Sequence, residues 1–339
     1  MTKVNLQKLT SIEVCAGAGG QAIGLELAGF DHVALVEIEE QFCSTLRFNR
    51  PEWNVIQADL NEFDGSPYSG VDLVAGGVPC PPFSKAGKQL GQKDERDLFP
   101  AALRLVNQTQ PKAVMIENVR GLLDPKFESY RNEISAELEE MGYIVDWKLL
   151  HAAHFGVPQL RPRTLMIALK PPYAPHFEWP EGNPNKPVSV GDALHELMSS
   201  LGWKKVNEWR EKASKVGPTL VGGSKKHGGA DLGPTRARAG WLSLGVDARG
   251  LTESPPLPDF EGIPRLTVKM AAIIQGFPKN WNFTGKKTAS YRQVGNAFPP
   301  PVAEAVGRAV HKAITLGDQE LATTPIVRRK INLSPARVS

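Results

Sequence analysis

A cysteine held among prolines is the first residue of this chain that could do chemistry. The stretch Gly77–Ser84 reads GVPCPPFS and places Cys80 shortly after the apolar run of residues 71–76. Because proline fixes its own φ and restricts the residue before it, the backbone sets the direction of the thiol. A thiol aimed in this way is a candidate nucleophile, which reacts as the thiolate. A small buried hydrophobic residue that ends a strand is the alternative explanation.

A carboxylate and two arginines also lie directly beside apolar runs of the sequence. Glu117 ends the run of residues 113–117, and Arg161 and Arg163 precede the run of residues 164–169. A buried carboxyl group has a raised pKa and can hold or give a proton, while a guanidinium group donates to carbonyl oxygens. A surface acid and a solvated arginine pair are the alternatives.

A glycine-rich turn near the start of the chain is typical of nucleotide binding. Residues 16–22 read AGAGGQA and fit the pattern G-x-G-x-x-A between an expected strand and an expected helix. Glu37 ends the next strand, 20 residues after Gly17, where a carboxylate meets ribose hydroxyls. Ile38 could support a base, and Asp59 could accept from an adenine amino group. A nicotinamide dinucleotide would fit this pattern as well, and so would a simple turn.

The elements that must position these side chains alternate between β-branched runs and amphipathic patterns. This alternation predicts an α/β fold, a Rossmann-like doubly wound and mostly parallel sheet. The expected strands are residues 11–15, 32–37, 54–57, 71–76, 113–117, 143–150 and 164–169, and the expected helices are residues 21–28, 39–48, 97–108 and 129–141.

Changes in composition and in hydrophobic periodicity predict the domain organisation. Residues 1–170 form a catalytic and cofactor-binding domain, and residues 171–262, rich in Pro, Gly and Trp, form a smaller irregular domain. Residues 263–316 return to complete the first domain. Residues 317–339 contain few large apolar groups and are expected to form a flexible tail.

Charge in the smaller domain is uneven. Ten Lys and Arg residues face four Asp and Glu residues between Lys204 and Arg249, a net charge of +6, whereas the whole chain carries +4. Together with Trp203, Trp209 and Trp241, these residues predict a surface that follows phosphates and reaches base edges. An ordinary solvated face is the alternative.

The composition argues against several classes of protein. Cys15, Cys43 and Cys80 are too few for a disulfide framework and lack the spacing of a metal site. No signal peptide and no apolar run long enough to span a membrane is found. We therefore expect a soluble protein in a reducing intracellular compartment.

In order along the chain, these segments resemble the DNA cytosine-5 methyltransferase family. EVCAGAGG, VEIEE and ADL resemble its three segments for S-adenosylmethionine, and GVPCPPFS resembles its nucleophile motif. Further matches are Glu117-Asn118-Val119, QLRPR at residues 159–163, RLT with QGFP at residues 265–278, and YRQVGNA at residues 291–297.

The resemblance implies a mechanism. Cys80 would attack carbon 6 of a cytosine rotated out of the duplex, which turns carbon 5 into a nucleophile. Glu117 would contact N3 and the amino group as a protonated carboxyl, Arg163 would donate to the carbonyl at position 2, and Arg161 would organise the site or contact a phosphate. The segment of residues 84–93 would form a lid.

The resemblance also implies the ligands. The cofactor is S-adenosylmethionine, no metal is expected, and the partner is double-stranded DNA. The expected cofactor-binding residues are Cys15, Ala16, Gly17, Ala18, Gly19, Gly20, Glu37, Ile38, Asp59, Leu60, Gly77, Pro79, Leu98, Asn296 and Ala297. The expected DNA-binding residues are Ser84, Lys88, Lys225, Lys226, Arg236 and Arg238.

Three residues depart from the family pattern. Cys15 stands where the family has Phe, so an aromatic contact to adenine is expected to be lost. Pro81 replaces Gln after the nucleophile, and Val78 replaces Phe.

We expect a monomeric, bacterial, cytoplasmic enzyme of the restriction-modification kind that acts beside a cognate endonuclease. A tRNA cytosine-5 methyltransferase and a catalytically silent DNA-binding relative are alternatives. An NAD-dependent oxidoreductase would leave the cysteine, ENV and QLRPR motifs without a role.

Overall fold

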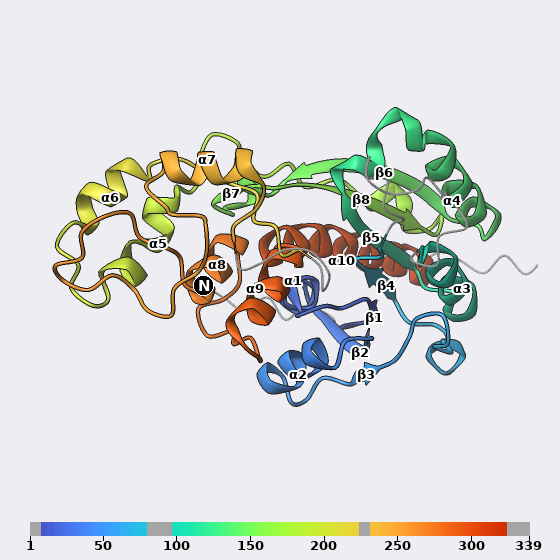
Figure 1. Cartoon of the computed structure of the whole chain (residues 1–339). Helices are drawn as coiled ribbons and strands as arrows, with labels where there is room; N and C mark the ends of the chain where they lie inside the picture. Colours follow the sequence, from blue (N-terminus) through green and yellow to red (C-terminus); the bar gives the residue numbers. More distant parts are fainter. Residues whose placement is uncertain (1–7, 80–96, 224–230, 324–339) are drawn as a thin grey trace, which may run out of the picture.

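The catalytic part of the chain is a seven-stranded sheet between two layers of helices (Figure 1). The computed structural model describes residues 8–79, 97–223 and 231–323. The sheet contains β1 (Leu9–Val14), β2 (Phe30–Glu37), β3 (Val55–Gln57), β4 (Leu73–Gly76), β5 (Ala113–Val119), β6 (Ile144–His151) and β8 (Pro162–Leu169). Their order is β3-β2-β1-β4-β5-β8-β6, and β8 alone points in the direction opposite to the other six strands. The expected α/β class with a mostly parallel sheet is confirmed.

Apolar side chains on both faces of the sheet attach the helices. On one face, Leu25 of α1 (Gly20–Ala28) and Val306 of α10 (Pro300–Thr323) belong to one core. On the other face, Phe99 of α3 (Phe99–Thr109) and Leu138 of α4 (Glu128–Glu140) belong to a second core. Helix α2 (Glu40–Asn49) follows β2 beside the sheet edge. Such two-sided burial explains why these strands read as continuous apolar runs.

The direction of the strand order reverses between β1 and β4, which are neighbours at the centre of the sheet. In open α/β sheets, ligands bind at the carboxyl ends of the strands at such a switch point. The turn with the glycines and the segment leading to Cys80 both follow these two strands. The topology therefore brings two separate sequence motifs to one edge.

The smaller region is built from short elements around a core that continues into the return segment and the first domain. It contains α5 (Val190–Ser199), α6 (Val206–Lys212), β9 (Gly217–Pro218) and α7 (Thr235–Ser243), and β9 pairs in parallel with β7 (Gln159–Leu160). The expectation that its tryptophans lie on a surface is wrong. Trp203, Trp209 and Trp241 are at most 4% exposed, because they fill the core between these helices.

The return segment contributes to both parts of the molecule. Helix α8 (Val268–Gln275) packs against α5, and its Met270 belongs to the core of the smaller region. Helix α9 (Lys287–Asn296) leads to α10, whose packing on α1 is close because Gly24 lies against Ala303 and the Pro300 carbonyl group.

The predicted start of a flexible tail at residue 317 is wrong, because α10 continues to Thr323. Gly317 packs against Tyr173, and the carboxylate of Asp318 lies 2.6 Å from Lys112 Nζ and accepts from the Tyr173 hydroxyl group. These contacts stabilise a polar last turn whose composition alone indicates no core. Residues 324–339 lie outside the described part of the chain.

Candidate active site

A cavity of about 290 Å³ opens at the carboxyl ends of β1, β2, β4 and β5. All of the expected cofactor-binding residues except Gly19 line it. Gly19 instead has a φ of 88°, and a Cβ atom there would lie 2.8 Å from Leu46 and 2.9 Å from Trp281. Residue 19 must therefore be glycine, because a side chain there would collide with Leu46 and Trp281 behind the cavity.

The glycine-rich turn is held from the opposite side by the return segment. A Cβ atom on Gly20 would lie 2.2 Å from the Phe298 carbonyl oxygen, so only glycine permits this approach. The Trp281 indole group donates to the Ala18 carbonyl oxygen at 3.1 Å. The turn and the α9–α10 junction therefore form one continuous wall.

Glu37 is fixed against this turn. Its Oε2 accepts from the Gly17 amide at 2.8 Å, and its Oε1 accepts from the Glu39 amide at 2.8 Å. Burial raises the pKa of Glu37, and these backbone hydrogen bonds partly oppose the shift. The carboxylate keeps further lone pairs for a ligand hydroxyl group.

The cavity fits S-adenosylmethionine in its chemistry. Glu37 and Asp59 supply acceptors for hydroxyl and amino groups, and Ile38, Leu60 and Leu98 supply apolar surface for a purine ring. Sequence reasoning missed seven lining residues, which are Glu13, Gln21, Val36, Phe42, Ala58, Gln293 and Phe298. Of these, Phe42 places an aromatic ring in the lining although Cys15 replaces the expected one.

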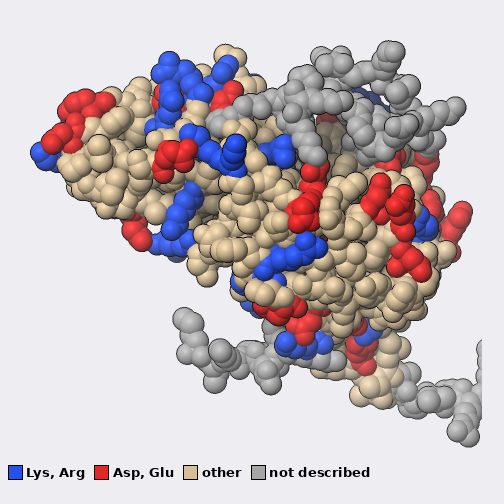
Figure 2. Space-filling view, turned by 60° about the horizontal axis from the view of Figure 1, so that its bottom comes forward, with Lys and Arg blue, Asp and Glu red and all other residues tan. Residues whose placement is uncertain are grey.

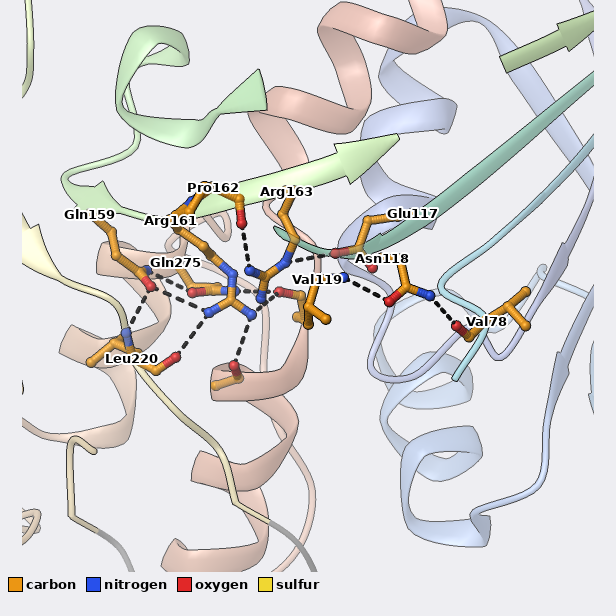
Figure 3. Close-up of polar contacts among 12 residues, drawn as sticks. Val78, Glu117, Asn118, Val119, Gln159, Arg161, Pro162, Arg163, Leu220 and Gln275 are labelled. Atoms are coloured by element: carbon orange, nitrogen blue, oxygen red, sulfur yellow. Dashed lines mark hydrogen bonds and ion pairs between the residues drawn. The ribbon is translucent and has the colours of Figure 1, made fainter. Parts of the chain in front are cut away.

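At the rim of the cavity, a carboxylate and a guanidinium group form a buried ion pair (Figure 3). Glu117 Oε1 lies 2.6 Å from Arg163 Nε, and each side chain is 12% exposed. Burial raises the pKa of Glu117, while the positive charges of Arg163 and Arg161 oppose the shift. This carboxyl group therefore holds a proton more readily than a solvated one.

Asn118 connects this pair to the segment before Cys80. Its side-chain Nδ2 donates to the Val78 carbonyl oxygen at 2.8 Å, and its Oδ1 accepts from the Val119 amide. Cys80 itself lies outside the described residues, as do Pro81, Ser84, Lys88, Lys225, Lys226 and the expected lid of residues 84–93.

Arg161 is only 2% exposed, so its side chain has almost no surface for a phosphate contact. Its guanidinium group donates to the carbonyl oxygens of Leu220, Gly295 and Ala297 at 2.9–3.0 Å. It thus joins the smaller region at Leu220 to the cavity wall at Ala297 (Figure 3). The alternative that Arg161 organises the site agrees with this geometry.

The amide of Gln159 completes this connection. Its Oε1 accepts from the Leu220 amide at 2.8 Å, and its Nε2 donates to Gln275 Oε1 at 2.7 Å. Gln159 is fully buried, so the first residue of the QLRPR motif holds three chain segments together.

The two remaining arginines expected to bind DNA lie on α7. Arg236 is exposed, and Arg238 is half-buried, with Nη1 at 3.7 Å from Asp231. Figure 2 shows Lys and Arg side chains over the left part of this face, where α5–α7 lie, interspersed with Asp and Glu that also gather at its far left tip; Asp and Glu predominate at the other end. Residues 171–262 as a whole carry eleven Lys and Arg against eleven Asp and Glu residues, so the excess of positive charge is confined to the part between Lys204 and Arg249.

Comparison with known proteins gives the family. The family described as C-5 cytosine-specific DNA methylase matches residues 9–312. The chain belongs to this family. The enzyme transfers a methyl group from S-adenosylmethionine to carbon 5 of cytosine in DNA.

Curated relatives cover most of this methyltransferase. It is 57% identical to the Type II methyltransferase M.NgoMIV of Neisseria gonorrhoeae over 310 residues, which is 91% of this chain and 98% of the relative. It is 51% identical to the Type II methyltransferase M.NaeI of Lentzea aerocolonigenes over 317 residues, which is 92% of this chain and 76% of the relative.

Solved structures show the same fold. A DNA modification methyltransferase encoded within a prophage of E. coli matches with a TM-score of 0.65 at 23% identity and covers 91% of this chain and 99% of its own. Spodoptera frugiperda DNMT2 matches with a TM-score of 0.61 at 19% identity and covers 89% and 99%.

Two kinds of feature are absent from the part of the chain that the structure describes. No helix there is long and apolar enough to cross a membrane. Nor do three or more His, Cys, Asp or Glu side chains in those ranges group as a metal site would require.

Proposed function

We propose that Cys80 is the nucleophile of the methylation, that Glu117 supplies the proton-holding carboxyl group, and that Arg163 donates to the target base. The observation that carries this proposal is the buried Glu117–Arg163 pair at the rim of the cofactor cavity. Asn118 supports it, because its hydrogen bond fixes Val78, two residues before Cys80.

The chemistry explains why these residue types are needed. Thiolate attack at carbon 6 of cytosine puts negative charge on the ring and makes carbon 5 a nucleophile. A protonated Glu117 at N3 would neutralise that charge, and the burial that raises its pKa favours the proton. Bound S-adenosylmethionine supplies the electrophilic methyl group.

Arg163 is suited to the carbonyl group at position 2. Its Nε is directed to Glu117, and its Nη1 donates to the Pro162 carbonyl oxygen. Since a guanidinium group carries five N–H donors, these two contacts orient the group and leave donors for the base. Arg161 acts from behind this site, as a positioning residue.

For the cofactor, we assign the ribose hydroxyl groups to Glu37 and the adenine amino group to Asp59. The residues of the glycine-rich turn, together with Gly77, Pro79, Asn296 and Ala297, form the remaining walls. The buried position of Glu37 beside the Gly17 amide supports this assignment.

For the substrate, we assign target recognition to residues 171–262, with Arg236 and Arg238 facing DNA. Because M.NgoMIV and M.NaeI are named Type II methyltransferases, we infer a Type II restriction-modification role beside an endonuclease of the same target. We further propose that the enzyme is a cytoplasmic monomer.

Trapping with 5-fluorocytosine tests the catalytic assignment. Fluorine cannot leave carbon 5 as a proton does, so the attacking thiol stays bonded to the base after methyl transfer. The protein is incubated with S-adenosylmethionine and a duplex pool of mixed sequence that contains 5-fluorocytosine, and adducts are measured by mass spectrometry. The unchanged protein and the Cys43→Ser variant are expected to form the adduct, whereas Cys80→Ser forms none.

Two outcomes would contradict the proposal. An adduct that persists in Cys80→Ser would assign the nucleophile elsewhere. An adduct on tRNA with none on the duplex pool would move the substrate to RNA. Cys43 is the matched control because its thiol is buried and donates to the Glu37 carbonyl oxygen behind the cavity.

A further inference from the structure

A shallow depression on the smaller region lies apart from the cofactor cavity. It has a volume of about 730 Å³, and Arg238, Leu242, Asp247, Arg249 and Ile263 are among the residues that line it. Leu242 and Ile263 are 50% and 43% exposed, which gives the depression apolar walls around charged groups. An apolar surface with a few oriented donors is the composition of a site that reads a base edge.

Asp247 fixes a guanidinium group at this depression. Its carboxylate is 11% exposed and accepts from Arg249 Nε at 2.9 Å and from Arg249 Nη2 at 3.0 Å. Arg265 Nε donates to the same carboxylate at 3.0 Å. The Arg249 side chain is itself 76% exposed, so a flexible surface residue is held in one orientation by a buried partner.

The backbone that carries Asp247 is anchored at three successive residues. The Val246 amide donates to the Trp241 carbonyl oxygen, and the Asp247 amide donates to the Pro264 carbonyl oxygen. The Ala248 carbonyl oxygen accepts from the Leu232 amide. Since each of these bonds joins the loop to a different segment, the position of Arg249 is set by the core of the smaller region.

The geometry of the pairing leaves a specific set of donors. A guanidinium group has five N–H donors in a planar fork, and Asp247 occupies the side formed by Nε and Nη2. The free end of the fork then presents two parallel N–H groups, one from Nη1 and one from Nη2. Two parallel donors match N7 and O6 of guanine in the major groove.

We propose that Arg249 is a specificity-determining residue that reads a guanine of the target sequence, and that Asp247 is its positioning residue. The inference rests on the proposed role of residues 171–262 in target recognition. One carboxylate between two guanidinium groups leaves a net charge of +1, which alone would also suit a phosphate, but a phosphate contact gains little from a fixed direction of the fork. A base reader gains direction from the same contact.

Short elements in contact with one another connect the depression to the edge of the sheet that carries the active site. Helix α7 packs against β9, where Gly240 lies close to Pro218, and β9 pairs with β7 directly before Arg161. Arg161 then donates to Leu220. A base held at Arg249 is thus connected to the active site through short, hydrogen-bonded elements.

The test compares variants on a duplex pool of random sequence. Each protein methylates the pool, and conversion sequencing gives the preference at every position of the target. We expect Arg249→Lys, which keeps the charge and loses the fork, to reduce discrimination at one guanine by about 5- to 150-fold. Asp247→Asn is expected to relax the same position, and thermal melting verifies that both variants fold.

Arg210→Lys is the matched control. Arg210 on α6 also pairs with a carboxylate through Nε and Nη2, which donate to Asp192 Oδ1 at 2.9 and 2.7 Å, but Asp192 is exposed and Arg210 does not line the depression. Its preference profile is expected to equal that of the unchanged protein.

Salt dependence of duplex binding separates a base contact from a phosphate contact. Arg249→Ala is expected to keep the slope of log affinity against log salt. A slope that becomes shallower by about 0.9, with equal weakening on all sequences, would assign Arg249 to a phosphate and overturn the inference. An unchanged profile in Arg249→Lys would also overturn it, whereas failure of the unchanged protein to methylate any duplex would refute the proposed function and the inference together.

Discussion

Glu117 and Arg163 meet diagonally across an antiparallel strand pair. Glu117 is the register partner of Leu165 and Arg163 is the partner of Val119, yet Glu117 Oε1 lies 2.6 Å from Arg163 Nε. Diagonal neighbours on one face of a sheet are within reach of long side chains. Because β8 runs antiparallel to β5, the start of one strand lies beside the end of the other, and two distant motifs meet at the carboxyl edge.

Replacement of Glu117 by Gln should slow methyl transfer by about 100-fold or more, because an amide cannot hold the proton that neutralises the attacked ring. Single-turnover methyl transfer to duplex DNA measures this. Thermal melting is followed in parallel, since the change leaves Arg163 without its anion. A rate within threefold of the unchanged enzyme would contradict the role of Glu117.

Lysine substitutions should separate the two arginines. Arg161→Lys is expected to lower the free energy of unfolding by at least about 2 kcal/mol, because an ammonium group cannot reach the carbonyl oxygens of Leu220, Gly295 and Ala297 together. Arg163→Lys should cost less stability and abolish most activity. Denaturant titration and methyl transfer on both variants check this; equal stability losses would refute the division of roles.

The Asn118→Asp variant should trap cytosine more slowly. A carboxylate has no donor for the Val78 carbonyl oxygen and repels it, so the segment before Cys80 loses its fixed position. We expect the rate of adduct formation with 5-fluorocytosine to fall at least about tenfold. Asn107→Asp, on the exposed side of α3, is the control and should have no effect.

The Gly20→Ala variant should bind S-adenosylmethionine more weakly. The new Cβ atom would lie 2.2 Å from the Phe298 carbonyl oxygen and push away the wall that also carries Ala297. We expect the dissociation constant for S-adenosylmethionine, measured by calorimetry, to rise more than about tenfold, the effect of roughly 1.4 kcal/mol. Gly121→Ala adds the same atom 4.0 Å from its nearest neighbour and should leave binding unchanged.

Glu13 should make stability depend on pH. It is 1% exposed, and burial raises its pKa well above the ordinary value of 4.5. The folded protein therefore binds a proton that the unfolded chain has lost, so this contribution is complete below about pH 4.5 and is lost as pH rises through the higher folded pKa. Its slope in that window is up to about 1.4 kcal/mol per pH unit. Glu13→Gln should flatten the profile of unfolding free energy against pH in cofactor-free protein; an identical slope would contradict this.

Sequence patterns were sufficient for the central sheet and for much of the cavity. Strands buried on both faces leave apolar runs, and glycines at a strand end leave a spacing that is visible in one dimension. Phe298 left no such signal, because it reaches the cavity from the return segment through packing alone, and Gln293 was not singled out although it lies in the YRQVGNA motif. Gln21 was missed within the glycine-rich turn, since a helix start does not reveal which side chain faces inward.

Residue type alone gave wrong predictions for the exposure of the tryptophans and for the start of the flexible tail. Trp241 is fully buried although basic residues surround it in the sequence, because tryptophan serves cores and interfaces equally well. The last turn of α10 is polar, and its stability comes from Lys112 and Tyr173 on elements far away in the sequence. The two arginine partners of Asp247 could not be predicted from the sequence either, because the fold brings Arg265 to the loop that carries Asp247 and Arg249.

The close packing of Gly24 against α10 relates activity to the order of protein synthesis. Helix α1 leaves the ribosome early, whereas Ala303 and the Phe298 carbonyl group, which pack against it, are made after residues 171–262. A chain that ends before Ala297 therefore lacks part of the cavity wall, because Ala297 and Phe298 line the cavity, and it also lacks α10, which packs on α1. We expect such a truncated chain to bind S-adenosylmethionine only weakly.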